Sequence, residues 1–275
     1  MNVPLQPEEK KRSAGFYASY LENSSAPLTC LIFSLPLFLV YHVGLWWINS
    51  FSELRWANAA DIAIANALSR LGMIGPPISF IAVLVVFLSM QAMSSRPPWR
   101  LPPGLTWFMM IVESFIFALP VFMLSRLVRL VTAGVELSAV DVIDVGGGIS
   151  WQANMILSCG AGVYEEFLFR LILMGVAVFV LDRVLGVTSG WKYILAALFQ
   201  ALAFAASHHL PGGPETISSV ADFSRHLSVF SFRAAAGVYF AFLYIERGFG
   251  ISAGSHAVYD LMIVALDLLA PGFEM

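Results

Sequence analysis

Residues 27–48 read PLTCLIFSLPLFLVYHVGLWWI, a run of 22 residues without a single Asp, Glu, Lys or Arg. A helix of about 20 apolar residues is long enough to cross the hydrocarbon core of a bilayer. The run ends near Trp46 and Trp47, and tryptophan is enriched where a helix meets the membrane–water interface. We therefore predict that this segment is a transmembrane helix.

The composition of the whole chain indicates the same environment. Charged residues make up only 12% of the 275 residues, and hydrophobic residues make up 59%. Soluble proteins carry about 25% charged residues, so this chain has too few polar side chains to cover a water-soluble fold of its length. The net charge of -3 provides no basic surface for nucleic acid. The composition thus excludes a soluble enzyme and predicts no nucleic-acid partner.

Further apolar runs recur between polar segments. We predict membrane spans at residues 27–48, 76–93, 105–124, 149–181, 191–209, 231–244 and 251–270. The sixth run is short for a span, so we expect the seventh to begin inside the membrane, after a turn at residues 248–250. Residues 52–70 carry apolar residues at helical spacing among charged ones, which predicts an amphipathic helix on the membrane surface. The predicted fold class is all-α, a polytopic transmembrane helical bundle of about seven spans plus one amphipathic surface helix.

The fourth predicted span contains three ionisable residues within six positions, Glu165, Glu166 and Arg170. Each ionisable side chain in hydrocarbon is costly unless it faces a partner or a cavity, so such a cluster is a candidate functional site. Glu166 and Arg170 are four residues apart, and we expect them to pair on one helical face. Glu165 lies about 100° further round an α-helix. That pair therefore cannot satisfy Glu165, which stays available as a general base.

Two later spans carry further polar residues at four-residue spacing. Phe204 and His208 share one face of the fifth span, with His209 turned aside, and His256 and Asp260 share one face of the seventh. Glutamate, histidine and aspartate from three helices are the residue types that activate a water molecule and stabilise the oxyanion of an attacked carbonyl.

Other polar or reactive residues favour structural roles. For Glu113 and His42 we predict structural hydrogen bonds between helices. Arg233 is expected to reach water with its charged end by snorkelling. Cys30 and Cys159 lie in apolar runs outside any metal-binding spacing, and we predict that both are small core residues.

The polar residues resemble the motifs of the CPBP intramembrane proteases, a family of type II CAAX prenyl endopeptidases and bacteriocin-processing Abi proteins. The family pattern is Glu-Glu-x-x-x-Arg, then Phe-x-x-x-His, then His-x-x-x-Asn or Asp, on successive membrane helices. The residues that match it, between residues 150 and 265, are Glu165, Glu166, Arg170, Phe204, His208, His256 and Asp260.

The resemblance implies a role for each matching residue. Glu165 would activate the hydrolytic water, and His208 would order or share it. His256 and Asp260 would polarise the scissile carbonyl and bind its oxyanion. Many relatives carry Asn at the position of Asp260, so this acid either donates a hydrogen bond itself or orients His256.

The remaining motif residues would be structural, Glu166 and Arg170 as an ion pair and Phe204 in the cavity wall. We predict a metal-free enzyme without a cofactor. Zinc remains an alternative, because carboxylate and imidazole are zinc ligands, and its candidate ligands are Glu165, His208, His256 and also Asp260. No HExxH pair is present.

The predicted function is that of an intramembrane, glutamic-type endopeptidase that acts on a membrane-associated protein or peptide within a lipid bilayer. The alternative is a non-proteolytic membrane immunity factor or proton-coupled carrier that uses the same carboxylates as a proton relay. We divide the chain into a polar N-terminal tail (1–26), N-terminal membrane helices (27–148), a catalytic membrane core (149–270) and a short tail (271–275). The expected location of this multi-pass protein is a bacterial inner (plasma) membrane, and its oligomeric state is left open.

Overall fold

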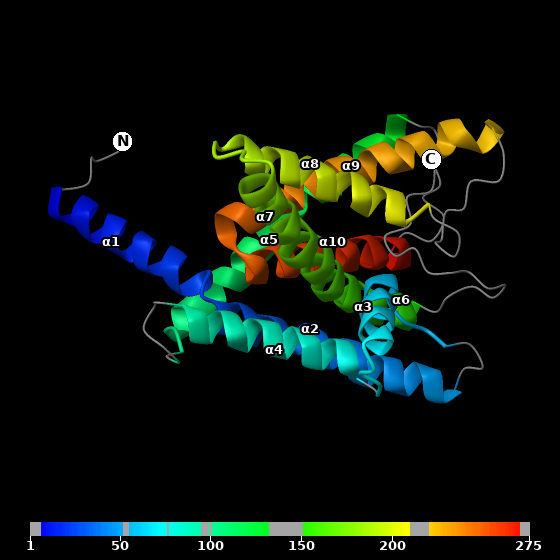
Figure 1. The fold of residues 1–275 in the computed structure, drawn as a ribbon, viewed down its shortest axis with the longest axis horizontal. Helices are drawn as coiled ribbons and strands as arrows, with labels where there is room; N and C mark the ends of the chain where they lie inside the picture. The colour runs from blue at the N-terminus through cyan, green and yellow to red at the C-terminus, as the bar shows by residue number, and fades with distance from the viewer. Residues whose placement is uncertain are drawn as a thin grey trace.

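The computed structural model describes residues 7–51, 55–75, 77–94, 99, 101–131, 151–209 and 220–269. All regular secondary structure in these ranges is helical, which confirms the all-α prediction (Figure 1). The elements are α1 (Pro7–Ser24), α2 (Pro27–Phe51), α3 (Ala59–Arg70), α4 (Ile78–Met93), α5 (Gly104–Val131), α6 (Trp151–Gly160), η1 (Ala161–Leu173), α7 (Met174–Phe179), η2 (Val180–Val184), α8 (Trp191–Ser207), α9 (Val220–Arg247) and α10 (Phe249–Leu269).

Several helices are suited to a bilayer. Within the described ranges, four helices are long and apolar enough to cross a membrane: α2, α5, α9 and α10. The helices α4 and α8 are apolar but shorter, and α6, η1, α7 and η2 follow one another without a break from residue 151 to residue 184. The chain is an integral membrane protein, and the count of seven spans stays a prediction.

The structure corrects three predicted boundaries. The surface helix begins at Ala59 rather than at residue 52, because the Asn58 side chain caps it by accepting hydrogen bonds from the backbone N–H groups of the first turn. The prediction of a short sixth span at residues 231–244 is wrong, since α9 extends over 28 residues. The seventh helix begins at Phe249 rather than at residue 251, and only Gly248, at φ +81°, separates it from α9. Most of the predicted N-terminal tail (1–26) is the helix α1, from Pro7 to Ser24. Its residues 1–6 and the predicted C-terminal tail (271–275) lie outside the described residues.

The centre of the bundle is α10, the most buried of the four candidate spans. It packs against α5, η1, α6, α2 and α9, and Figure 1 shows it in orange to red between α2 and α9. Small residues on different faces of α10 allow this close packing, as is common between membrane helices. Gly254 packs against Ser114 of α5, and Ala253 and Ala257 pack against Gly162 of η1.

The contact at Gly162 leaves no room for a side chain. A Cβ atom there would lie 2.6 Å from the Ala257 Cβ and 2.8 Å from the Ala253 carbonyl oxygen. We expect Gly162→Ala to lower the free energy of unfolding by about 1–3 kcal/mol, because α10 has to move away from η1. Gly175→Ala is the matched control, since nothing lies within 4 Å of the added Cβ. Thermal unfolding in one detergent compares the two variants, and equal midpoints would contradict the packing described.

A buried polar cluster away from the predicted site connects α1, α5 and α9. The Arg247 Nη2 atom lies 2.5 Å from Glu113 Oε2, and the Tyr20 hydroxyl donates to the same oxygen at 2.9 Å. Burial raises the pKa of Tyr20, which keeps its phenol in the protonated, donating form. The predicted structural role of Glu113 is confirmed. His42 is likewise hydrogen-bonded, to the Tyr164 hydroxyl at 2.7 Å.

Three other side chains test the remaining structural predictions. Cys30 and Cys159 are free and buried, which confirms that they are core residues. Arg233 is only 8% exposed, so the prediction that its charged end reaches water is wrong. It lies inside the bundle near Tyr259 and Asp260, with which it interacts electrostatically.

Candidate active site

The helix that carries Glu165, Glu166 and Arg170 is a π-helix from Ala161 to Leu173. In a π-helix each N–H bonds to the carbonyl five residues earlier, and such segments occur frequently at functional sites. Each turn therefore holds more residues than an α-turn, and consecutive side chains are separated by a smaller angle. The carboxylates of Glu165 and Glu166 can thus reach the two sides of the His256 ring on α10.

Glu166 is completely buried and has three partners. Its Oε1 atom lies 3.3 Å from Arg170 Nη1 and 2.8 Å from His256 Nδ1, and its Oε2 atom accepts a hydrogen bond of 2.5 Å from the Ser252 hydroxyl. The predicted pairing of Glu166 with Arg170 is confirmed. Glu166 also fixes the orientation of a histidine on another helix, which the sequence interpretation did not include.

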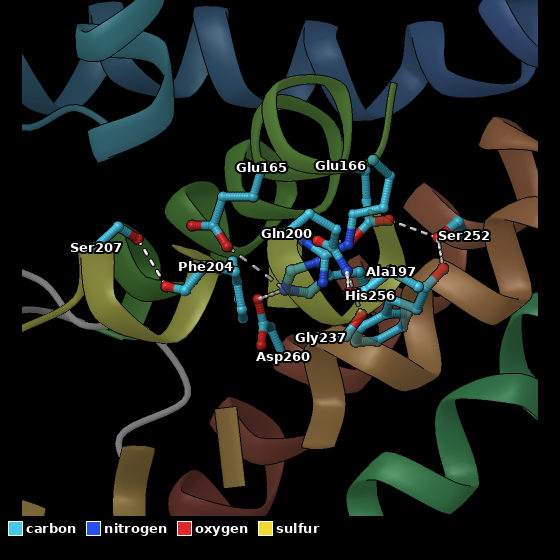
Figure 2. A network of polar contacts seen from close by, with 12 residues as sticks. Glu165, Glu166, Ala197, Gln200, Phe204, Ser207, Gly237, Ser252, His256 and Asp260 are labelled. Atoms are coloured by element: carbon cyan, nitrogen blue, oxygen red, sulfur yellow. Dashed lines mark hydrogen bonds and ion pairs between the residues drawn. The ribbon is translucent and has the colours of Figure 1, made fainter. Parts of the chain in front are cut away.

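The imidazole of His256 is held on one side and open to two acids on the other (Figure 2). A carboxylate only accepts hydrogen bonds, so the contact with Glu166 requires a proton on Nδ1 of His256. The Nε2 atom lies 3.8 Å from Glu165 Oε2 and 3.7 Å from Asp260 Oδ2. Both distances exceed a direct hydrogen bond and lie within the range of an ion pair with a protonated imidazole.

Glu165 divides its two carboxylate oxygens between two helices. Its Oε2 atom faces His256, and its Oε1 atom accepts a hydrogen bond of 3.0 Å from the Asn58 side-chain amide. Glu165 thus has its hydrogen-bond partner outside the Glu166–Arg170 pair, as the prediction that this pair cannot satisfy it requires. The additional partner comes from the residue before α3, which lies 107 positions earlier in the sequence.

Aromatic rings form the wall around these polar groups. The Arg170 guanidinium carbon lies 4.5 Å from the centre of the Phe204 ring, a cation–π contact that helps to stabilise a buried charge. The Phe240 ring stacks on His256 with the ring centres 4.7 Å apart and the planes at 15°. The predicted position of Phe204 beside the site is confirmed, whereas Phe240 was missed.

His208 lies at the end of α8, next to Phe204. Its ring centre is 4.8 Å from that of Phe204, and Nδ1 lies 2.8 Å from the Phe204 carbonyl oxygen. A carbonyl oxygen can only accept, so Nδ1 carries a proton, and Nε2 is the acceptor of a neutral ring. His208 also interacts electrostatically with Glu165 and His256. The structure thus brings the candidate residues of three predicted spans together.

The zinc alternative requires at least three ligating side chains around one point. In the described ranges, no group of three or more His, Cys, Asp or Glu side chains is arranged to hold a metal ion. The Nδ1 atom of His256 is engaged by Glu166, so only its Nε2 atom could ligate. A carboxylate on the other ring nitrogen is also usual for a zinc-ligating histidine, so the metal-free enzyme and its zinc alternative, with Glu165, His208, His256 and also Asp260 as ligands, both stay predictions.

Sequence reasoning missed Asn58, Ser252 and Phe240. Ser252 could have been found, because it precedes His256 by four residues and shares its face of α10. Asn58 has the sequence signal of a helix cap, an Asn before an apolar-rich helix with an acid at its third position. No local signal, however, indicates that the same Asn contacts Glu165.

The fold and the site define an integral membrane protein of the helical class with a buried cluster of glutamate, histidine and aspartate. Residues 148–262 match the family model described as Rce1-like, type II CAAX prenyl endopeptidase. The match contains all seven motif residues, and it confirms the resemblance to the CAAX proteases for this segment. Comparisons with curated proteins and with solved structures found no match.

Proposed function

We propose that the chain is an intramembrane endopeptidase in which Glu165 activates a water molecule that hydrolyses a peptide bond of a membrane-associated protein or peptide. The observation that most supports this proposal is the convergence of Glu165, His256 and Asp260. Both acids lie within 3.8 Å of the Nε2 atom of His256. The family match supports the class of reaction. It does not favour the alternative of an immunity factor or proton-coupled carrier.

In the proposed reaction, Glu165 takes a proton from the water as the water oxygen attacks the scissile carbonyl carbon. The C–N bond then breaks, and Glu165 returns the proton to the leaving nitrogen, so that it ends the cycle ionised as it began. Neutral His208 would order the water by accepting its second hydrogen bond at Nε2. These steps use the carboxylate of Glu165 and the imidazole of His208, and they form no covalent bond between enzyme and substrate.

The oxyanion formed by the attack needs a hydrogen-bond donor. A protonated His256 can supply one, because its Nδ1–H group donates to Glu166 and its Nε2–H group is directed to the other side of the ring. Asp260 acts either as a second donor in its protonated form or as the group that orients His256. Glu166 and Arg170 serve this step indirectly, by holding the imidazole in place.

We propose that no metal takes part in this reaction. Purified protein dialysed against a strong chelator should keep its cleavage rate within about twofold, because none of the proposed steps uses a metal. A catalytic zinc, by contrast, would be required for all of the rate. Mass spectrometry of the dialysed sample for bound metal provides the control. A rate that disappears on dialysis and returns with added zinc would contradict the proposal.

The substrate can be sought through the protein ends that the reaction creates. Quantitative comparison of protein termini in cells that carry the wild-type chain and cells that carry Glu165→Gln should reveal termini that only the wild type produces. Prenylated CAAX proteins and peptide leaders are the substrate classes to examine first. Identical sets of termini in the two cell lines would contradict the proposed function.

A further inference from the structure

Asn58 stands outside the segment that matches the endopeptidase family, which covers residues 148–262. It precedes α3, the short amphipathic helix between α2 and α4. Nevertheless its side-chain amide reaches Glu165 Oε1 at 3.0 Å, and only 7% of the residue is exposed. The site that carries the proposed chemistry therefore includes a residue from the N-terminal half of the chain.

The two ends of the Asn58 amide have different partners. Its oxygen accepts hydrogen bonds from the backbone N–H groups of Ala60 at 2.9 Å and Asp61 at 3.4 Å, as the cap of α3. Because these partners can only donate to an oxygen, the amide cannot be rotated by 180°. The NH2 group must face Glu165, and the hydrogen bond to the carboxylate follows from the capping geometry.

A second set of hydrogen bonds fixes the Asn58 backbone. Its N–H group donates to the Tyr41 hydroxyl at 2.8 Å, and that hydroxyl donates to Asp61 Oδ2 at 2.8 Å. The Ser79 hydroxyl of α4 donates to the other oxygen of Asp61. Tyr41 itself is fully buried in α2. Asn58 is thus held by neighbours on three helices, which is the support that a precisely placed functional side chain needs.

The hydrogen bond from the Asn58 amide to Glu165 Oε1 limits the rotation of the Glu165 carboxylate. With Oε1 bound by Asn58, the remaining oxygen, Oε2, is the one that faces His256 Nε2 at 3.8 Å. In the described part of the chain, no hydrogen bond besides that from Asn58 holds this carboxylate. Without Asn58 it could turn about its last bond and place neither oxygen correctly for the water.

We infer that Asn58 is a positioning residue of the proposed endopeptidase, which orients the general base Glu165, and that α3 belongs to the active site. This inference rests on the proposed function of Glu165. It assigns to the N-terminal helices a part in the reaction besides that of membrane anchor. The capping role of Asn58 and its positioning role depend on different atoms, so substitutions can separate them.

Asn58→Ser is the first test. Serine caps a helix about as well as asparagine but is too short to reach Glu165. We expect thermal unfolding of the variant to match that of the wild type, while kcat falls about 10- to 100-fold and KM changes less than about twofold. The substrate is a synthetic peptide that spans the cleavage site found by the comparison of termini. Asn66→Ser, at an exposed position of the same helix, is the matched control and should retain the wild-type kcat.

Asn58→Asp is the second test, because aspartate has the same size and also caps the helix. Its ionised side chain cannot donate to Glu165, and we expect a larger loss of kcat than in Asn58→Ser. The double variant Asn58→Ser/Glu165→Gln should be no slower than Glu165→Gln alone, since a residue that acts only through Glu165 has nothing left to position.

The outcomes distinguish this inference from the proposed function. Wild-type kcat in Asn58→Ser together with an inactive Glu165→Gln protein would overturn the role of Asn58 alone. Activity that falls in both Asn58 variants only in proportion to the loss of folded protein would overturn it as well. Full activity in Glu165→Gln, or no terminus that depends on Glu165, would instead overturn the proposed function.

Discussion

Glu165→Gln should lower kcat for peptide cleavage by about 10²- to 10⁴-fold, the range attributed to a positioned general base. Glutamine has the shape of glutamate and can still accept the hydrogen bond from the Asn58 amide, which the wild-type carboxylate accepts at 3.0 Å. It cannot take a proton from water. The fold and the substrate contacts should therefore persist, and KM should stay within about threefold, because only an interaction of the transition state is lost.

The measurement is the initial rate of cleavage by purified protein at several substrate concentrations. Glu246→Gln is the matched control, because it removes an exposed carboxylate of α9 and should have wild-type kinetics. An equal fall of kcat in both variants would indicate a general effect of the lost charge. A wild-type kcat in Glu165→Gln would contradict the assignment of the base.

Glu166→Gln should have a different consequence, a loss of stability of about 3–5 kcal/mol, as expected when one partner of a buried ion pair is removed. Both Glu166 and Arg170 are 0% exposed, and Glu166 is the salt-bridge partner of Arg170 at 3.3 Å. The substitution leaves the guanidinium charge buried without its counter-ion. It also weakens the hold on His256, so the residual folded protein should be less active.

The double variant Glu166→Gln/Arg170→Met separates the two contributions. Replacement of both charges should recover part of the stability, since an uncompensated charge costs more than an apolar pair. The recovered protein should remain slow, because His256 still lacks the carboxylate that orients it. Thermal unfolding in one detergent gives the stability. A Glu166→Gln protein as stable as the wild type would contradict the buried ion pair.

Much of this fold follows from the sequence because lipid imposes simple rules. The uncharged run at residues 27–48 had to be helical to satisfy its backbone in hydrocarbon, and α2 extends from Pro27 to Phe51. The boundaries that were wrong depend on other forces. Residues 220–230 are too polar to resemble a span, yet α9 includes them, since a helix can extend beyond the apolar region.

The candidate site was predictable where it depends on spacing within one helix. Glu166 with Arg170, and His256 with Asp260, each lie four residues apart and meet as expected. The π-helical form of η1 was not predictable, because no residue spacing in the sequence distinguishes it from an α-helix. The contact of Asn58 with Glu165 joins two distant segments, and no periodicity in the sequence encodes it.

Incubation of the reconstituted wild-type chain with its peptide substrate in water enriched in ¹⁸O tests the central claim most directly. We expect two fragments, with one ¹⁸O atom in the new carboxyl group and a combined mass that exceeds the peptide by one water. We also expect that Glu165→Gln protein binds the same peptide and leaves it intact. Cleavage by Glu165→Gln at the wild-type rate, or no cleavage by the wild type, would contradict a glutamate-activated hydrolysis.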